Sequence, residues 1–254
     1  MRSECSTLIA AVFLTLASCS PPSPGTSDAV QNEPPNEPRT RCVEQWKSVA
    51  NGAEYKTLGC PEVDLHLVRV DPKVFHLDAV MQPGSTAQSL ARSYPFVLNA
   101  NFFDEQYRPL GVVVSGGKPL NRVHPVSWQS VFFVTDDGRP AIELAGDWDA
   151  SRDHVQMAVQ CGPRLYVDGK RTDANNAPPT NRAGVCITPG AKVIFFATPE
   201  ERQLSVGETM DLLGGLGCRE AMLFDGGPSV QLHLAGAVDV EGDKRVPAFV
   251  VGKP

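Results

Sequence analysis

Short apolar runs closed by glycine, proline, asparagine or aspartate recur along most of this chain, and they constrain its fold more than any other feature. Runs of this length, some of them alternating with polar residues, favour β-strands with one or both faces buried. Such strands are expected at residues 63–70, 74–80, 96–98, 110–114, 131–135, 155–159, 192–197, 221–224 and 248–251. Strands therefore dominate the expected fold.

Only two segments favour helices. Residues 86–93 suit a short helix, which Pro95 ends. A second helix is expected to begin at Ser205, because Ser205 and Glu208 fit a capping box, and to end near the glycines of residues 214–217. The expected fold class is α+β: a single strand-rich domain with a mixed β-sheet and few helices.

The beginning of the chain is typical of an export signal. Residues 8–16 are apolar or small, which is enough for the core of a signal peptide but too short to span a bilayer. They lead into residues 16–19, Leu-Ala-Ser-Cys, which resemble the lipobox of bacterial lipoproteins. We therefore expect a lipoprotein signal peptide over residues 1–18 and a lipid on Cys19. A plain signal peptide and a buried N-terminal helix are the alternatives.

A proline-rich segment follows Cys19. Residues 21–38 contain almost no large apolar side chains, so they cannot bury enough surface to fold. We expect an extended tether over residues 19–41 and the folded domain over residues 42–254. Ser20 is not the aspartate that usually retains a lipoprotein in the inner membrane. The expected location is the outer membrane, facing the periplasm.

The charge balance limits the classes of partner. The formal net charge is -6, so the chain has no basic field that would attract nucleic acid, and none is expected as a partner. Contact with the membrane is expected through the lipid anchor only. A few arginine side chains and backbone N–H groups can still hold an anion locally.

The seven cysteines divide by position. Cys5 lies in the expected signal peptide and Cys19 is the expected lipidation site. Cys42 and Cys60 bracket a short segment and are expected to pair in an oxidising compartment. The remaining three allow one more bridge and a free thiol. Because the sequence has no C-x-x-C pair and no histidine cluster at metal spacing, no metal and no cofactor are expected.

Polar residues that follow expected strands are candidates for a site, since strand ends often display functional groups. The first such segment, residues 99–104, carries Asn99, Asn101 and Asp104 directly after an apolar run. A turn built from these residues is the structural alternative. The second, residues 160–164, includes Gly162 and Arg164, and its Gly-Pro pair also suits a turn.

Two further segments lie later in the chain. Arg182, just before an apolar run, offers a fork of donors to a phosphate or carboxylate, although it could be an ordinary surface arginine. Asp225 ends an apolar run and precedes Gly226 and Gly227, with Ser229 shortly after. An Asp-Gly hairpin would explain this pattern. Alternatively, the glycines let backbone N–H groups approach an anion beside the carboxylate.

Taken in order, these segments resemble a known family. NANFFD, QCGPRLYVDGK, NRAGV and LGCREAMLFDGGPSVQL resemble the phosphodiester glycosidases, over residues 63–251. The chain has Asn101 where that family often has glycine, and Pro228 where it often has glycine or serine. The resemblance implies a carbohydrate or sugar-phosphate substrate and hydrolysis between the anomeric carbon and a phosphodiester oxygen. In this envelope protein, the substrate would be a glycan or cell-envelope polymer.

The resemblance also suggests roles for the candidate residues. A phosphate leaving group is a weak base, so stabilising charge matters more than protonation. Arg182 and the backbone at Gly226 and Gly227 would hold the phosphate, and Asp225 would activate water or stabilise the sugar cation. Asp104 is a second carboxylate candidate. The expected catalytic residues are Asp225, Arg182, Asn101 and Asp104, with Asn99, Gly226, Gly227, Gly162, Arg164 and Ser229 expected to bind substrate.

Two other functions fit the sequence. A non-catalytic module that binds envelope glycan or a partner protein could use the same fold. A hydrolase with a serine or cysteine nucleophile is the other, but the chain has no G-x-S-x-G elbow, and Cys161 would need a nearby histidine. His124 is the histidine in an apparent loop that could reach a site. Trp46, Trp128 and Trp148 could stack on sugars, with core packing as the default.

Overall fold

The structure, a computed structural model, describes residues 43–149, 151, 154–174 and 177–254. The expected signal peptide, the expected lipidation site Cys19 and the whole of the expected tether lie outside these ranges. No helix within the ranges is long and apolar enough to cross a membrane.

Three sheets build the domain. The largest runs in the order β1 (Lys47–Ala50), β2 (Ala53–Leu58), β3 (Leu65–Val70), β14 (Val193–Ala197), β13 (Ala183–Ile187), β15 (Glu220–Leu223), β11 (Arg164–Val167) and β12 (Lys170–Arg171). The second runs β7 (Lys118–Asn121), β6 (Val113–Ser115), β10 (Val155–Cys161), β8 (Ser130–Thr135) and β9 (Pro140–Leu144). The third runs β17 (Val238–Val240), β16 (Leu232–Leu234), β5 (Phe96–Asn99), β18 (Val246–Lys253) and β4 (His76–Ser85).

One apolar core joins the three sheets. Phe195 of β14 packs against Phe96 of β5, with ring centroids 4.9 Å apart, and against Phe132 of β8, with centroids 5.8 Å apart. These three side chains come from three different sheets and are all fully buried. Because the sheets share this core, their strand ends are held at fixed positions relative to one another.

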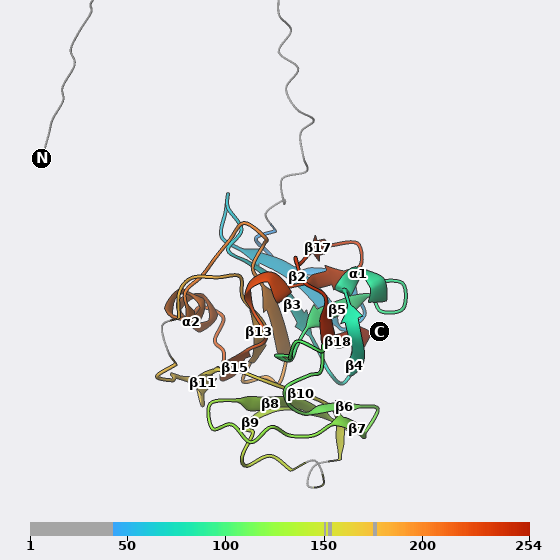
Figure 1. Cartoon of the computed structure of the whole chain (residues 1–254). Coiled ribbons are helices and arrows are strands. Elements are labelled where there is room, and N and C mark those ends of the chain that lie inside the picture. Colours follow the sequence, from blue (N-terminus) through green and yellow to red (C-terminus); the bar gives the residue numbers. More distant parts are fainter. Residues whose placement is uncertain (1–42, 150, 152–153, 175–176) are drawn as a thin grey trace, which may run out of the picture. The chain divides into compact units, whose positions relative to one another are not determined.

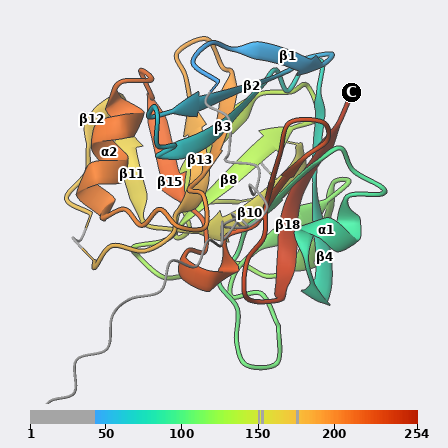
Figure 2. The ribbon, with the colours of Figure 1, turned by 90° about the horizontal axis from the view of Figure 1, so that it is seen from above.

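The helices cover the outer faces of two sheets. α2 (Val206–Gly214) packs with Leu213 and Met210 against the face of the largest sheet that points away from the shared core. α1 (Ala87–Leu90) packs against β5 and β18 of the third sheet. Figures 1 and 2 show α2 and α1 on different sides of the domain, with the second sheet, containing β8 and β10, alongside both other sheets.

The expected strand-rich α+β domain with few helices is confirmed. One feature differs: every strand pair among the described residues is antiparallel, so the sheets are not mixed. The apolar runs β13 and β14 are buried on both faces, a pattern typical of parallel sheets. Here the shared core covers one face and α2 covers the other.

Four of the seven cysteines lie in the described residues. Cys60 is disulfide-bonded, and Cys42, its expected partner, lies outside the described residues. Cys186 and Cys218 form a bridge, with Cα atoms 5.6 Å apart, which ties β13 to the segment just before β15. Cys161 is free and buried. Of the three cysteines that the sequence left open, Cys186 and Cys218 are the bridged pair and Cys161 is the free thiol.

Ser205 caps α2 as its sequence predicts. Its hydroxyl accepts from the Glu208 N–H at 3.1 Å, and the Glu208 carboxylate accepts from the Ser205 N–H at 2.8 Å. We expect Ser205→Ala to lower the free energy of unfolding by about 1 kcal/mol, because it leaves the Glu208 N–H without this acceptor. Urea denaturation measures the change. Ser205→Asn, which can still cap, is the control, and an equal loss in both variants would contradict the capping role.

Candidate functional site

Strand ends from all three sheets meet at one place. Asp225, just after β15, donates its N–H to the carbonyl of Ala100, just after β5, at 2.9 Å. The Asn99 side chain donates to the carbonyl of Asp225 at 2.7 Å. Cys161, the last residue of β10, is close enough to Asp225 for the charge of that carboxylate to raise the pKa of the thiol. Residues widely separated in the sequence are thereby brought around Asp225, the first two through its backbone.

The Asp225 carboxyl is mostly withdrawn from solvent, and this burial raises its pKa to about 6. Three groups oppose the shift: a hydrogen bond from the Ser229 hydroxyl, one from the Gly226 N–H, and the charge of Lys244. Removal of water destabilises the carboxylate more than these partners stabilise it. A carboxyl with a pKa near neutrality can accept or donate a proton at physiological pH.

Asn99 and Asn101 differ in what their side chains do. Asn99 ties two loops together, because it donates to Asp225 and accepts from the Gln231 N–H at 3.0 Å. Asn101 donates to the Val112 carbonyl at 3.1 Å, but its Oδ1 is buried and has no partner among the described residues. A buried acceptor without a donor costs about 1–3 kcal/mol. This atom is therefore placed to accept from a water or a substrate hydroxyl.

Gly226 and Gly227 lie against the chain just before β13. The Gly227 N–H donates to the Asn181 carbonyl at 2.8 Å. A Cβ on Gly226 would lie 2.8 Å from that same carbonyl oxygen, closer than real Cβ atoms come. Gly227 has a φ of +59° and begins the 3-10 turn of residues 227–229, so the expected alternative of an Asp-Gly hairpin does not occur. Here, glycine permits the close approach of two backbone segments.

Arg182 lies beside this contact and is buried. One residue further along, the Ala183 carbonyl accepts from the Phe224 N–H at 2.8 Å, which brings the backbone of Arg182 next to that of Asp225. The guanidinium donates to the carbonyls of Leu204 and Pro178, at 2.8 and 3.1 Å. Within the described residues it has no carboxylate partner. Burial lowers its pKa without removing its charge.

The Cys161 thiol borders the same carboxyl. It is fully buried, and burial together with the negative charge of Asp225 raises its pKa well above the ordinary value. The backbone N–H groups of Gly162 and Phe102 act in the opposite direction. The thiol is therefore neutral at physiological pH, which argues against Cys161 as a nucleophile.

The side chains of two residues predicted from the sequence, Asp104 and Arg164, bond to partners outside this cluster. Asp104 pairs with Arg108 at 2.7 Å on an exposed loop, and hydrogen bonds from Arg108 and Gln106 hold its pKa below the ordinary value. Arg164 pairs with Glu220 at 2.5 Å and donates to the Ile142 carbonyl at 3.0 Å. Both therefore serve as partners in local ion pairs. Of the two candidate carboxylates, the structure groups Asp225 with Asn99, Gly226 and Ser229. Arg182 adjoins Asp225 through the backbone, while its guanidinium bonds the carbonyls of Leu204 and Pro178.

Two residues near the cluster, Gln160 and Lys244, were not named from the sequence as site candidates, whereas His124 was. Gln160 is fully buried and its amide joins the backbone of Val112 and His124 to the Gln129 side chain. Lys244 is exposed and adds positive charge near Asp225. No local sequence signal marks Lys244, because a tertiary contact brings it there. His124 bonds Gln160 through its backbone while its side chain is exposed.

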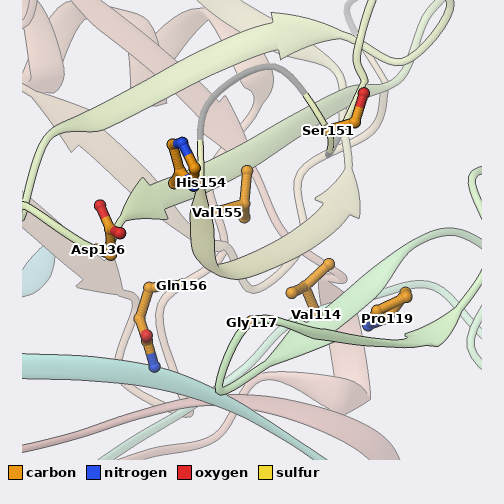
Figure 3. A pocket seen from close by; sticks show the side chains of 8 residues that line it. All are labelled: Val114, Gly117, Pro119, Asp136, Ser151, His154, Val155 and Gln156. Atoms are coloured by element: carbon orange, nitrogen blue, oxygen red, sulfur yellow. The ribbon is translucent and has the colours of Figure 1, made fainter.

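A separate pocket of about 380 Å³ lies on the second sheet. Figure 3 shows its lining, with Asp136 well apart from Ser151 and with His154 between them in this view. No sequence-predicted site residue lines it. Ser151 bonds Asp149 at 2.9 Å instead of a histidine, so the three side chains do not form a catalytic triad. Among the described residues, no group of three or more His, Cys, Asp or Glu side chains could hold a metal ion.

The domain places an aspartate whose carboxyl is mostly withdrawn from solvent at the meeting point of three antiparallel sheets. A family model for phosphodiester glycosidases matches residues 93–251, and the chain belongs to that family. The matched region contains all four candidate segments from the sequence: residues 99–104, residues 160–164, the segment with Arg182, and residues 225–229.

Known proteins share parts of the sequence and the fold. Uncharacterized protein YigE of Escherichia coli (strain K12) is 29% identical over 114 residues, 41% of this chain and 44% of that protein. The chain therefore matches less than half the length of this relative. The zebrafish N-acetylglucosamine-1-phosphodiester alpha-N-acetylglucosaminidase catalytic domain, auto-inhibited by its pro-peptide, superposes with a TM-score of 0.62 at 12% identity, covering 81% of this chain and 89% of that one. A hypothetical protein from Synechocystis gives 0.56 at 14% identity, covering 82% and 61%.

Proposed function

We propose that this protein is a glycosidase that hydrolyses a sugar-1-phosphodiester bond in a glycan or cell-envelope polymer. The buried Asp225 carboxyl, with a pKa of about 6, carries this proposal. Membership of the phosphodiester glycosidase family supports the reaction type. The name of the zebrafish relative makes N-acetylglucosamine the first sugar to test.

The proposed reaction assigns each group a step. A water oxygen attacks the anomeric carbon while Asp225 accepts the water proton, and the bond from that carbon to the phosphodiester oxygen breaks. The oxygen leaves with the phosphate as a phosphomonoester, and the sugar leaves with a new hydroxyl. Because the phosphate is a weak base, this step needs no general acid. The free Oδ1 of Asn101 is suited to orient the water.

The phosphate needs positive charge, and two cations are available. Arg182 is a buried guanidinium whose described partners are backbone carbonyls, so an anion nearby would balance its charge. Lys244 is exposed and close enough to act on Asp225 electrostatically. We propose that Arg182 and the N–H groups around Gly227 hold the phosphate, with Lys244 attracting it.

An isotope experiment tests the reaction and the bond that breaks. The purified protein is incubated in H₂¹⁸O with the methyl diester of α-N-acetylglucosamine 1-phosphate, and the products are followed by phosphorus NMR and mass spectrometry. We expect a phosphomonoester without ¹⁸O and a free sugar that carries ¹⁸O. Label in the phosphate would mean cleavage at phosphorus. Binding without turnover would instead favour the non-catalytic glycan-binding module.

Lys244 offers a prediction about substrate binding. We expect Lys244→Gln to raise KM for this diester by roughly threefold to tenfold at low salt, because the substrate is anionic. The difference should shrink in 0.5 M salt, since exposed charges are screened. Steady-state kinetics at both salt concentrations measure it. Lys170→Gln, which removes an exposed lysine of β12, is the matched control. An effect independent of salt would argue against attraction of the phosphate.

The cellular location is a separate proposal. We propose that Cys19 carries the lipid anchor and that residues 19–41 tether the domain to the outer membrane, facing the periplasm. The apolar run of residues 8–16 and the lipobox-like residues 16–19 support it. Labelling of expressing cells with a radioactive fatty acid tests the proposal. Equal labelling of the native chain and of Cys19→Ala would reject it.

A further inference from the structure

Trp128 is the most exposed large apolar side chain of the described residues. It is 51% exposed, although tryptophan normally buries most of its surface. Its ring contacts Phe102, with ring centroids 5.7 Å apart and planes tilted by 55°. Phe102 is itself only partly buried. The two rings form an exposed aromatic surface, which we call the Trp128–Phe102 platform.

Gly162 packs against Trp128 of the platform. A Cβ placed on Gly162 would lie 3.5 Å from Cε3 of the Trp128 ring and 2.9 Å from the Trp128 carbonyl oxygen. The second distance is too short for a real Cβ, so a side chain at residue 162 would displace Trp128. Glycine at this position therefore lets the indole lie close to the backbone.

The platform also adjoins the proposed catalytic carboxyl. Gly162 follows Cys161, whose thiol lies within the electrostatic influence of Asp225. Phe102 follows Asn101, and the Phe102 N–H interacts with the Cys161 sulfur. Trp128 thus packs against Gly162, next to Cys161, and Phe102 follows Asn101, so both rings lie beside segments of the Asp225 site. A molecule bound at Asp225 could extend over these rings.

We propose that the Trp128–Phe102 platform binds a pyranose ring of the substrate, next to the bond that is cleaved. One face of a pyranose presents C–H groups, which are apolar and weakly positive, and the face of an indole is apolar and weakly negative. Stacking of the two rings removes apolar surface from water on both sides. This inference rests on the proposed function, and it adds a binding residue that touches the sugar but not the reacting atoms.

Two probes separate this inference from the proposed reaction. Neutral triacetylchitotriose, which has no phosphate, is titrated against the full chain while tryptophan fluorescence is recorded. We expect a spectral change that disappears in Trp128→Phe and persists in Trp46→Phe. Isothermal titration calorimetry, which needs no indole at residue 128, measures the affinities: Trp128→Ala should weaken chitotriose binding roughly tenfold, and Trp128→Phe, which retains a ring, by no more than about threefold. Val74→Ala, an exposed apolar residue before β4, is the control.

The second probe is the methyl diester of α-N-acetylglucosamine 1-phosphate. We expect Trp128→Ala to raise KM roughly tenfold and to leave kcat nearly unchanged, because the platform binds ground and transition states alike. Trp128-dependent chitotriose binding without hydrolysis would uphold the platform and reject the proposed reaction. Hydrolysis with an unchanged KM would reject the platform alone. Absence of chitotriose binding with dimerisation that Trp128→Ala abolishes would assign the surface to a second copy.

Discussion

Asp225→Asn should abolish hydrolysis of the sugar-1-phosphodiester and yet stabilise the fold at neutral pH. An amide cannot accept the proton of the attacking water, so we expect kcat/KM to fall by about a thousandfold. The wild-type kcat/KM should rise tenfold per pH unit below about pH 6 and level off above it, since the base must be ionised. Steady-state kinetics from pH 4.5 to 8 measure both effects.

The stability effect follows from the same pKa. An aspartate carboxyl in the unfolded chain has its ordinary pKa of 3.8, whereas Asp225 in the folded domain has one of about 6, so the folded state binds the proton more tightly. The tighter proton binding in the folded state stabilises the domain fully below pH 3.8, and this stabilisation is lost as the pH rises through 6. The loss amounts to about 3 kcal/mol for a shift of about two units. Asparagine stays neutral, so Asp225→Asn should exceed wild type in stability by up to that amount at pH 8, with no difference near pH 4.

The free energies of unfolding of wild type and Asp225→Asn must be compared at each pH separately. Burial lowers the pKa of His66 to about 4, so acid destabilises wild type and variant alike through this histidine. Asp104→Asn decides between the two candidate carboxylates, because Asp104 is ion-paired with Arg108 and its pKa is lowered, not raised. We expect it to bring no gain in stability at pH 8 and little loss of activity. A thousandfold loss in Asp104→Asn would contradict the assignment of the base to Asp225.

Local sequence patterns were sufficient to predict many elements but not their pairing. The capping box at Ser205 and the apolar run of β14 are local features, and both elements form where expected. Strands such as β2, β9 and β16 were not predicted, because they are short or half polar and depend on their neighbours. Tertiary contacts decide such segments. The antiparallel pairing likewise depends on which strands share the core.

The candidate site was partly predictable because some of its residues follow local apolar patterns. Asn99, Asn101 and Asp225 each follow a strongly apolar strand, and the strand ends place them together. Arg164 has the same sequence context, but its guanidinium reaches Glu220 on a neighbouring strand. The contribution of Lys244 depends on the folding of the loop after β17, which no local pattern marks. Residue types at strand ends therefore indicate candidates, and cross-strand partners decide which of them remain available.

Gly226→Ala tests whether the close backbone contact beside Asp225 is needed for function. The new Cβ would lie 2.8 Å from the Asn181 carbonyl oxygen, which also accepts the Gly227 N–H. The segments must separate, which moves the Arg182 backbone away from that of Asp225. Because misplacement by about 1 Å can cost a hundredfold in rate, we expect kcat/KM to fall by about that factor.

Gly226 lies after β15 and at the start of the 3-10 turn, outside the shared apolar core, so we expect Gly226→Ala to remain folded, with a loss of about 1–3 kcal/mol in stability. Circular dichroism and urea denaturation establish this before kinetics are compared. Gly146→Ala is the matched control, because a Cβ there meets no atom within 4 Å. Full activity in Gly226→Ala would show that the contact between the Asn181 carbonyl and the 226–227 segment does not position the reacting groups, and the phosphate would then have to be held elsewhere.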